Sequence, residues 1–198
     1  MSKRTILRKV CVYCASSSQL DSIYINAAKE LGKLLAQNNI EIVYGAGSVG
    51  LMGNLANSAL ENGGKVTGVI PKFMVELEWA HKGITDLKIF ESMPERKNLL
   101  IDGTDAVIAL PGGSGTLEEL LEVISLKRLG IYLNPIVILN TGGYFDPLIE
   151  QLNRCIEHRF MDTKHKSMWV VIKQPEGLFK AIEDSPKWSP ESINFAGV

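Results

Sequence analysis

The sequence lacks any apolar run approaching the roughly 18 residues that a membrane-spanning helix needs. Its basic start, with Lys3, Arg4, Arg8 and Lys9, is not followed by the apolar stretch and cleavage site of a signal peptide. These absences predict a cytoplasmic protein that does not act on a membrane.

A strong charge of either sign is also missing. The formal net charge is −1, and the 21 basic and 22 acidic residues are spread along the whole chain. Proteins that bind nucleic acid without regard to its sequence need clustered lysine and arginine to neutralise phosphates. The composition therefore argues against a nucleic-acid partner and favours a small ligand.

Cysteine and histidine are scarce. Cys11 and Cys14 lie three residues apart in an expected strand, so their side chains should point to opposite faces of a sheet. We expect buried thiols rather than a paired redox or metal site. His81, His158 and His165 lack the spacing of metal ligands and are expected on the surface or in loops, so no metal site is predicted.

Short β-branched runs alternate with longer helical patterns along the chain. This alternation predicts an α/β fold, a Rossmann-like doubly wound parallel sheet of about seven strands with helices on both faces. The strands are expected at residues 9–14, 41–44, 65–70, 87–90, 106–110, 135–139 and 168–172. The helices are expected at residues 23–37, 51–61, 95–101, 116–129, 145–157 and 177–183.

The length of 198 residues suits one domain spanning residues 1–198. We expect its ordered core at about residues 9–184. Beyond Asp184 the sequence has prolines and little apolar periodicity, which predicts a loosely held tail. The segment 71–86 has no clean period either and is expected to be a loop over the strand ends, where sites are common.

The first of two glycine-rich turns, residues 45–50, matches the G-x-G-x-x-G pattern between a strand and a helix. It follows the second strand, and the next strand ends near Ile70 without the acidic residue that binds the ribose of NAD. A dinucleotide site and a tight packing turn are two interpretations. We favour a third, in which Gly45 and Gly47 form a surface against which part of a smaller ligand lies.

The second turn, residues 110–115, leaves a strand and opens a helix. Its small residues let backbone N–H groups converge on an anion, and the helix N-terminus adds about half a positive charge. A Walker A loop would need a lysine before the serine or threonine, and none is present, so a monophosphate fits better than a triphosphate. A glycine turn without a ligand is the alternative.

Capping boxes offer a second explanation for the polar residues near these helix starts. Thr116 and Glu119 have the spacing at which each side chain satisfies the other's free backbone N–H, a role that is worth about 1 kcal/mol and needs no chemistry. Residues 92–95 have the same pattern before the helix that carries Arg96 and Lys97. From the motifs alone, a capping role and a chemical role are equally good explanations of these residues.

Together these stretches make the chain strongly resemble the LOG family, the cytokinin riboside 5′-monophosphate phosphoribohydrolases, from about Cys11 to Ile172. The pattern P-G-G-x-G-T-x-x-E is intact at residues 111–119, the Arg-Lys pair stands at Arg96 and Lys97, and G-S-V-G-L-M-G occupies residues 47–53. Residues 128–131 and 143–148 are also similar to family stretches.

The resemblance implies that a homodimer cleaves a nucleoside 5′-monophosphate to free base and ribose 5-phosphate, without cofactor or metal. It implies catalysis by Arg96 and Glu119. The substrate contacts that we expect are Gly45, Gly47, Glu78, Lys97, Gly112, Gly113, Ser114, Gly115, Thr116, Leu117, Glu118 and Ser125. Family members have often carried a lysine-decarboxylase label, which we reject because no motif here identifies a pyridoxal phosphate lysine.

Three departures from the family pattern concern the pocket around the base. Residues 93–95 read Met-Pro-Glu where Met-His-x is frequent, Ser114 replaces a commonly aromatic residue, and Ala46 stands where glycine is usual. AMP and a cytokinin nucleotide therefore both stand as substrates. The main rival is a carrier of a phosphorylated ligand, as molybdenum-cofactor carriers resemble this fold; a carrier would need the phosphate turn but not the Glu119 carboxylate.

Cleavage at an anomeric carbon builds positive charge on the sugar, which calls for a carboxylate and a positioned water. We expect Glu119, in the first helical turn, to be ionised and to serve both needs, with Arg96 orienting it. The helix 116–129 has more apolar surface than one core-facing stripe. Burial in the monomer and a homodimer seam both explain that surface, and the resemblance favours the seam.

Overall fold

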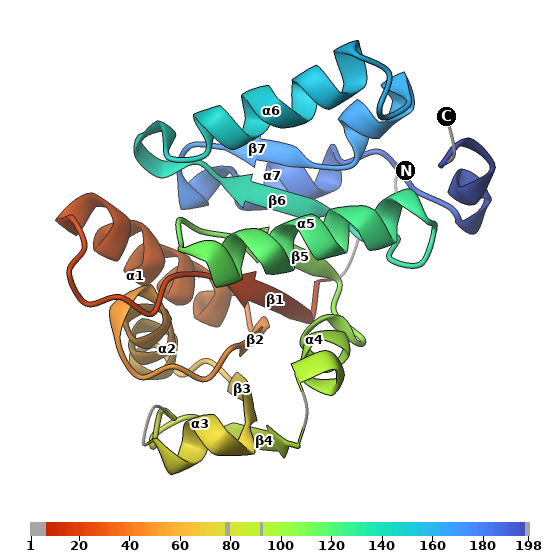
Figure 1. Cartoon of the computed structure of the whole chain (residues 1–198). Helices are drawn as coiled ribbons and strands as arrows, with labels where there is room; N and C mark the ends of the chain where they lie inside the picture. The colour runs from red at the N-terminus through yellow and green to blue at the C-terminus, as the bar shows by residue number, and fades with distance from the viewer. Residues whose placement is uncertain (1–6, 78–79, 92, 197–198) are drawn as a thin grey trace.

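The computed structural model describes residues 7–77, 80–91 and 93–196, which form one seven-stranded sheet flanked by helices (Figure 1). All strand pairs are parallel, in the order β4-β3-β2-β1-β5-β6-β7. The strands are β1 (Lys9–Tyr13), β2 (Glu41–Tyr44), β3 (Val66–Pro71), β4 (Asp86–Phe90), β5 (Ala106–Ala109), β6 (Ile136–Leu139) and β7 (Val170–Ile172). The predicted α/β fold class is confirmed.

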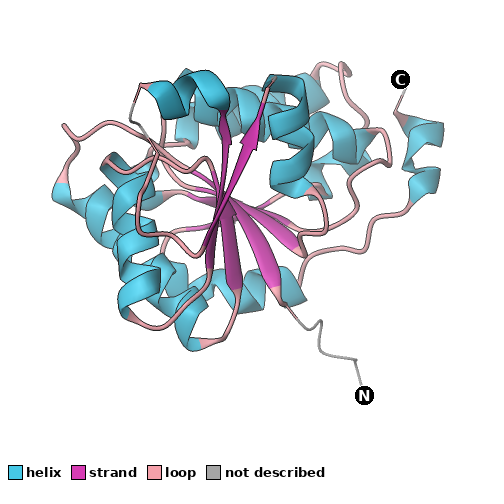
Figure 2. Ribbon diagram, turned by 90° about the horizontal axis from the view of Figure 1, so that it is seen from below, coloured by secondary structure: helices cyan, strands magenta, loops and turns pink. Residues whose placement is uncertain are grey.

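Helices cover both faces of the sheet, as the view along it shows (Figure 2). One face packs against α1 (Ser22–Gln37), α2 (Gly50–Glu61) and α7 (Leu178–Glu183). The other packs against α4 (Met93–Ile101), α5 (Ser114–Arg128) and α6 (Asp146–Glu157). Alternate residues of a strand face opposite sides. Accordingly, Cys11 and Cys14 are buried in the two different cores, as their spacing predicted.

The strand order reverses between β1 and β5. The chain runs outward from β1 to β4 on one side, then returns to β5 and continues to β7 on the other. Hydrogen bonds tie the two central strand ends: the Leu110 N–H donates to the Tyr13 carbonyl at 2.9 Å, and the Ala15 N–H to the Pro111 carbonyl at 3.2 Å. In open α/β sheets the crevice beyond such a reversal is the usual ligand site.

Two local predictions were wrong. The segment 71–86 contains the short helix α3 (Lys72–Glu76), and a five-residue helix is too brief to show a helical period. His165 was expected on the surface or in a loop, but it lies in η2 (Thr163–Ser167), where it is buried. Its ring packs against Phe195, and its Nδ1 accepts a hydrogen bond from the Asp162 N–H. The remaining 3-10 helices are η1 (Thr141–Gly143), η3 (Pro175–Gly177) and η4 (Pro190–Phe195).

The C-terminal segment is held more closely than predicted. Trp188 Nε1 donates to the Lys127 carbonyl at 2.7 Å, and Arg128 Nε to the Ala196 carbonyl at 2.9 Å. A Cβ on Gly130 would lie 2.6 Å from the Pro190 oxygen, so a glycine is needed where this segment meets the end of α5 (Figure 1). The expectation of a loose tail failed because polar and aromatic contacts, which leave no periodic pattern, hold it.

Over the described residues, no helix combines the length and apolarity needed to cross a membrane. In the same part of the chain, no three His, Cys, Asp or Glu side chains gather as metal ligands would.

Candidate active site

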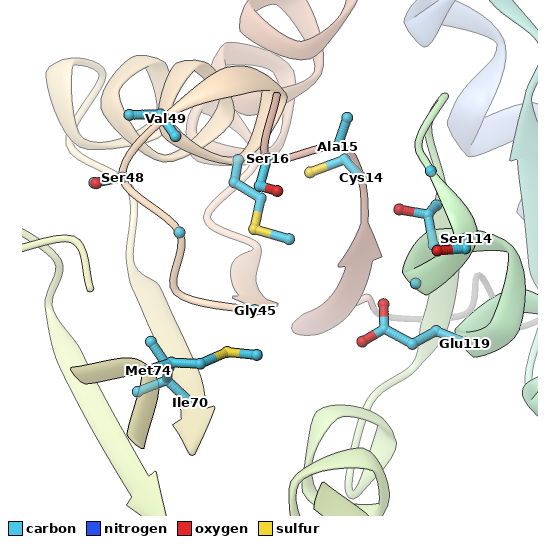
Figure 3. Close-up of a pocket in the computed structure, with 15 residues that line it drawn as sticks. Cys14, Ala15, Ser16, Gly45, Ser48, Val49, Ile70, Met74, Ser114 and Glu119 are labelled. Carbon is cyan, nitrogen blue, oxygen red and sulfur yellow. The ribbon is translucent and has the colours of Figure 1, made fainter. Parts of the chain in front are cut away.

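A cavity of about 660 Å³ opens beyond the carboxyl ends of the central strands (Figure 3). The segments that follow β1, β2 and β5 form most of its wall, and β3 and α3 complete it. It is lined by Cys14, Ala15, Ser16, Gly45, Gly47, Ser48, Val49, Met52, Ile70, Met74, Gly113, Ser114, Gly115, Thr116 and Glu119. Seven residues from our predicted site are in this set: Gly45, Gly47, Gly113, Ser114, Gly115, Thr116 and Glu119.

The start of α5 presents free backbone donors at the cavity wall. Gly113 is the N-cap, with an extended backbone and no side-chain capping bond, and Ser114 is the first helical residue. Leu117 donates the first i→i−4 bond, to the Gly113 carbonyl at 3.1 Å. The amides of Ser114, Gly115 and Thr116 precede it and so have no partner within the helix. All three residues line the cavity.

The capping box that was one of two interpretations of Thr116 and Glu119 does not form, because Gly113 is the N-cap of α5. Because α5 begins at Ser114, Thr116 is its third residue and Glu119 its sixth. Glu119 therefore lies beyond the first turn, and the helix-end argument for its ionisation does not apply. The start of the helix was placed too late because its N-cap is Gly113, which has no side chain. A glycine N-cap is harder to recognise in a sequence than a Ser or Thr N-cap.

Glu119 brings a carboxylate to the cavity although it is only 8% exposed. The carboxylate points into the space between the walls (Figure 3). Among the described lining residues it is the only formally charged group. Burial, together with this nearby negative charge, raises the pKa of the Cys14 thiol. Cys14 therefore presents a neutral thiol at the wall.

The glycines of the α5 turn have different roles. A Cβ on Gly112 would lie 2.1 Å from Thr116 Oγ1, so Gly112 makes room for the buried Thr116 side chain rather than lining the cavity. A Cβ on Gly113 or Gly115 would meet nothing within 4 Å. Gly112 is thus a packing position, whereas Gly113 and Gly115 are open to a ligand.

The turn after β2 combines close packing with exposure to the cavity. Gly50 has φ +65°, and its Cβ would lie 2.4 Å from the Ser17 carbonyl, so this turn abuts the loop after β1. Ala46 is buried with φ +62°, a conformation that glycine adopts without strain. This explains why glycine is usual there. Gly45 and Gly47 line the cavity, as the interpretation that we favoured requires.

An apolar wall was missed in the sequence. It consists of Val49, Met52, Ile70 and Met74, with Ile70 and Met74 opposite Glu119 (Figure 3). Cys14, Ala15, Ser16 and Ser48 were missed as well. Recognising that the strand order reverses at β1 would have identified the residues after that strand. Met74 carries no such signal, because it depends on the unpredicted α3.

Five of the predicted contacts that the structure describes, Gly112 among them, do not line the cavity. Leu117, Glu118 and Ser125 border a shallow groove on the outer side of α5, together with Ser114, Leu121 and Glu122. Lys97, on α4, forms an ion pair with Glu118, and its Nζ lies 3.5 Å from Glu122 Oε1. The hydrogen bond to Glu118 raises the pKa of Lys97. This lysine is therefore engaged with the outer face of α5.

Arg96 is the fourth residue of α4. This helix follows β4 and so begins beyond the carboxyl ends of the strands, on the side of the sheet where the cavity opens. Its side chain is outside the described part of the structure. Glu78 and Ser92, the latter the expected cap of α4, also lie outside the described residues.

Known proteins are similar to this chain in sequence and in fold. A family profile described as "Possible lysine decarboxylase" matches residues 52–182. The chain is 42% identical to a probable cytokinin riboside 5′-monophosphate phosphoribohydrolase of Oryza sativa subsp. japonica, over 95% of this chain and 81% of that protein. It is 37% identical to a cytokinin riboside 5′-monophosphate phosphoribohydrolase of Arabidopsis thaliana, over 92% of this chain and 85% of that protein.

A solved structure, the molybdenum cofactor carrier protein of Chlamydomonas reinhardtii, shares the fold. Its TM-score is 0.68, with 19% identity over 89% of this chain and 96% of that one. At that identity the likeness concerns the fold alone, whereas the plant relatives match in sequence over nearly the whole chain. The chain therefore belongs to the LOG family of cytokinin riboside 5′-monophosphate phosphoribohydrolases.

Proposed function

We propose that the protein hydrolyses the N-glycosidic bond of a nucleoside 5′-monophosphate and releases free base and ribose 5-phosphate. One observation carries the proposal: a single helix, α5, brings both the amides of its first turn, which have no partner within the helix, and a carboxylate to the same cavity. Ser114 and Glu119 are five residues apart, or about 7.5 Å along the axis at 1.5 Å per residue. That separation is on the scale of one ribose 5-phosphate, with its phosphate at the helix start and its anomeric carbon near Glu119.

The reaction needs a nucleophilic water and a leaving base. The water oxygen bonds to the anomeric carbon as the carbon–nitrogen bond breaks, and the electron pair of that bond leaves with the base. One water proton passes to the base, with the Glu119 carboxylate as its relay. The same carboxylate stabilises the positive charge that develops on the sugar. No cofactor takes part in this scheme.

Arg96 complements Glu119 in this proposal. A guanidinium is too basic to act as an ordinary proton donor. Its role is to orient Glu119 and the phosphate and to stabilise the charge on the departing base. Lys97, Glu78 and Ser125 remain proposed substrate contacts on the strength of the family resemblance alone.

The apolar wall favours a base that carries an apolar substituent. Met52, Ile70 and Met74 offer aliphatic and thioether surface rather than hydrogen-bonding groups. Each buried methylene contributes about 0.8 kcal/mol, nearly fourfold in affinity. We therefore propose isopentenyladenosine monophosphate as a better substrate than AMP. Equal kcat/KM values for the two would show that this wall does not contact the substituent.

We further propose a cytoplasmic homodimer whose seam includes the outer groove of α5. Leu121 is 39% exposed there, next to the half-buried Leu117. Covering this groove would remove apolar surface from water. Light scattering after size exclusion should give twice the mass of one chain at micromolar concentration, and a monomer would contradict the seam.

Product analysis tests the proposed reaction. The protein is incubated with AMP or isopentenyladenosine monophosphate, and free base and ribose 5-phosphate are separated by chromatography. The proposal expects both products in equal amounts. Tight nucleotide binding without either product would instead support a carrier. The molybdenum cofactor carrier protein resembles this chain in fold alone.

A further inference from the structure

A tyrosine outside the cavity contacts the turn that opens α5. Tyr144 follows η1, beyond β6, and its hydroxyl donates to the Gly112 carbonyl at 2.5 Å. We propose that Tyr144 is a positioning residue, which fixes the Gly112–Gly113 peptide so that the Gly113 N–H faces the phosphate. The inference rests on the proposed function, because it assigns Tyr144 a task in binding that phosphate.

The geometry of a peptide group supports this task. In a planar trans peptide the carbonyl and the following N–H point in opposite directions. A hydroxyl that holds the Gly112 carbonyl therefore directs the Gly113 N–H away from Tyr144. Gly113 lines the cavity, whereas Gly112 and Tyr144 are not among its lining residues.

The turn needs such a contact because its two glycines leave the peptide free to rotate. Before them the chain is fixed to β1, through the bonds of Leu110 to Tyr13 and of Ala15 to Pro111. After Pro111 there is no side chain to restrict the backbone until Ser114. A flipped peptide would turn the Gly112 carbonyl, a negative dipole, toward the anion.

Tyr144 is held in place independently of its hydroxyl. The buried Asn140 accepts the Phe145 N–H at 2.7 Å and donates to Asp146 Oδ1 at 2.7 Å, which ties the residues just after the tyrosine to the end of β6. The Tyr144 ring packs edge-on against Phe145 and Tyr24, with centroid distances of 5.1 and 6.0 Å. Tyr144→Phe therefore removes the hydrogen bond and keeps the ring packing.

The experiment compares Tyr144→Phe with Tyr24→Phe, which removes a hydroxyl from the adjacent ring of the same aromatic group. Calorimetry measures the Kd of ribose 5-phosphate for both variants and the wild type. A typical net hydrogen bond corresponds to roughly a 3- to 10-fold change. We expect the Kd to rise by that factor for Tyr144→Phe and to stay at the wild-type value for Tyr24→Phe, with the melting temperatures of both variants within a few degrees of the wild type.

Kinetics separate positioning from a general structural effect. For Tyr144→Phe, KM for the nucleotide should rise more than kcat falls, because the reacting carboxylate is untouched. An unchanged Kd, or an equal rise in both variants, would overturn the inference. If the wild type binds ribose 5-phosphate but releases no base, the proposed hydrolysis is refuted and the Tyr144 comparison remains valid. If the wild type does not bind ribose 5-phosphate, both the proposed hydrolysis and the role of Tyr144 are overturned.

Discussion

Alanine at Gly112 would place a methyl group where Thr116 already lies. Its Cβ would be 2.1 Å from Thr116 Oγ1 and 2.5 Å from Thr116 Cβ. Thr116 is β-branched and therefore stiff at χ1, and it is only 5% exposed, so its side chain resists moving aside. Overpacking of this kind costs about 1–3 kcal/mol. At about 2–4 °C per kcal/mol for a chain of this size, the melting temperature should fall by roughly 2–12 °C.

Gly113→Ala is the matched control, one residue along the same turn. Its Cβ would meet nothing within 4 Å, and φ −78° suits alanine, so the fold should keep its melting temperature. The added methyl would stand beside the free amides of α5 and should weaken ribose 5-phosphate binding. Thermal unfolding and calorimetry of both variants test this division of roles. A Gly112→Ala protein as stable as wild type, or an equal loss in both variants, would refute it.

Two further predictions concern close packing and a buried charge. Gly50→Ala should destabilise the protein more than Gly63→Ala. Both glycines have a positive φ, but only at Gly50 would the new Cβ meet backbone atoms. Equal denaturation midpoints for the two variants would contradict this. Burial lowers the pKa of Lys127 to about 8, whereas an unfolded lysine titrates near 10.4, so the unfolded chain binds the extra proton between these values. The free energy of unfolding of the wild type relative to Lys127→Met should therefore rise by on the order of 2–3 kcal/mol from pH 8 to 10 and be constant below pH 8. Denaturant titrations at several pH values measure this difference. A difference that does not change with pH would argue against a buried ammonium.

The elements that the sequence predicts well are those with a local signal. Strand β2 matches its expected limits, because a β-branched run between turn residues is visible without tertiary information. The start of α5 was misjudged by two residues because Thr116 resembles a cap, whereas Gly113 performs that role without a side chain. Helix α3 was missed because five residues span little more than one turn.

The location of the site was predictable in part for a physical reason. Glycine turns after parallel strands converge at one edge of the sheet, which brought Gly45, Gly47 and Gly113 to one cavity. The contribution of Cys14 could not be read locally, since it depends on β1 lying beside β5. Tyr144 and Gly112 are 32 residues apart in sequence, and their contact likewise depends on β6 lying next to β5.

The carboxylate of Glu119 is the centre of the proposed chemistry, so its replacement tests the account most directly. Glu119→Gln keeps the size of the side chain and removes its charge. Glu150→Gln makes the same change on the exposed surface of α6 and serves as the control.

Initial rates of free-base release from isopentenyladenosine monophosphate are measured for both variants and the wild type, with ribose 5-phosphate binding as a check of folding. Acid–base and charge stabilisation of this kind is worth about 10²–10⁴ in rate. The account predicts a loss in that range for Glu119→Gln, with ribose 5-phosphate still bound, and a wild-type rate for Glu150→Gln. A folded Glu119→Gln protein that releases base at the wild-type rate would contradict it.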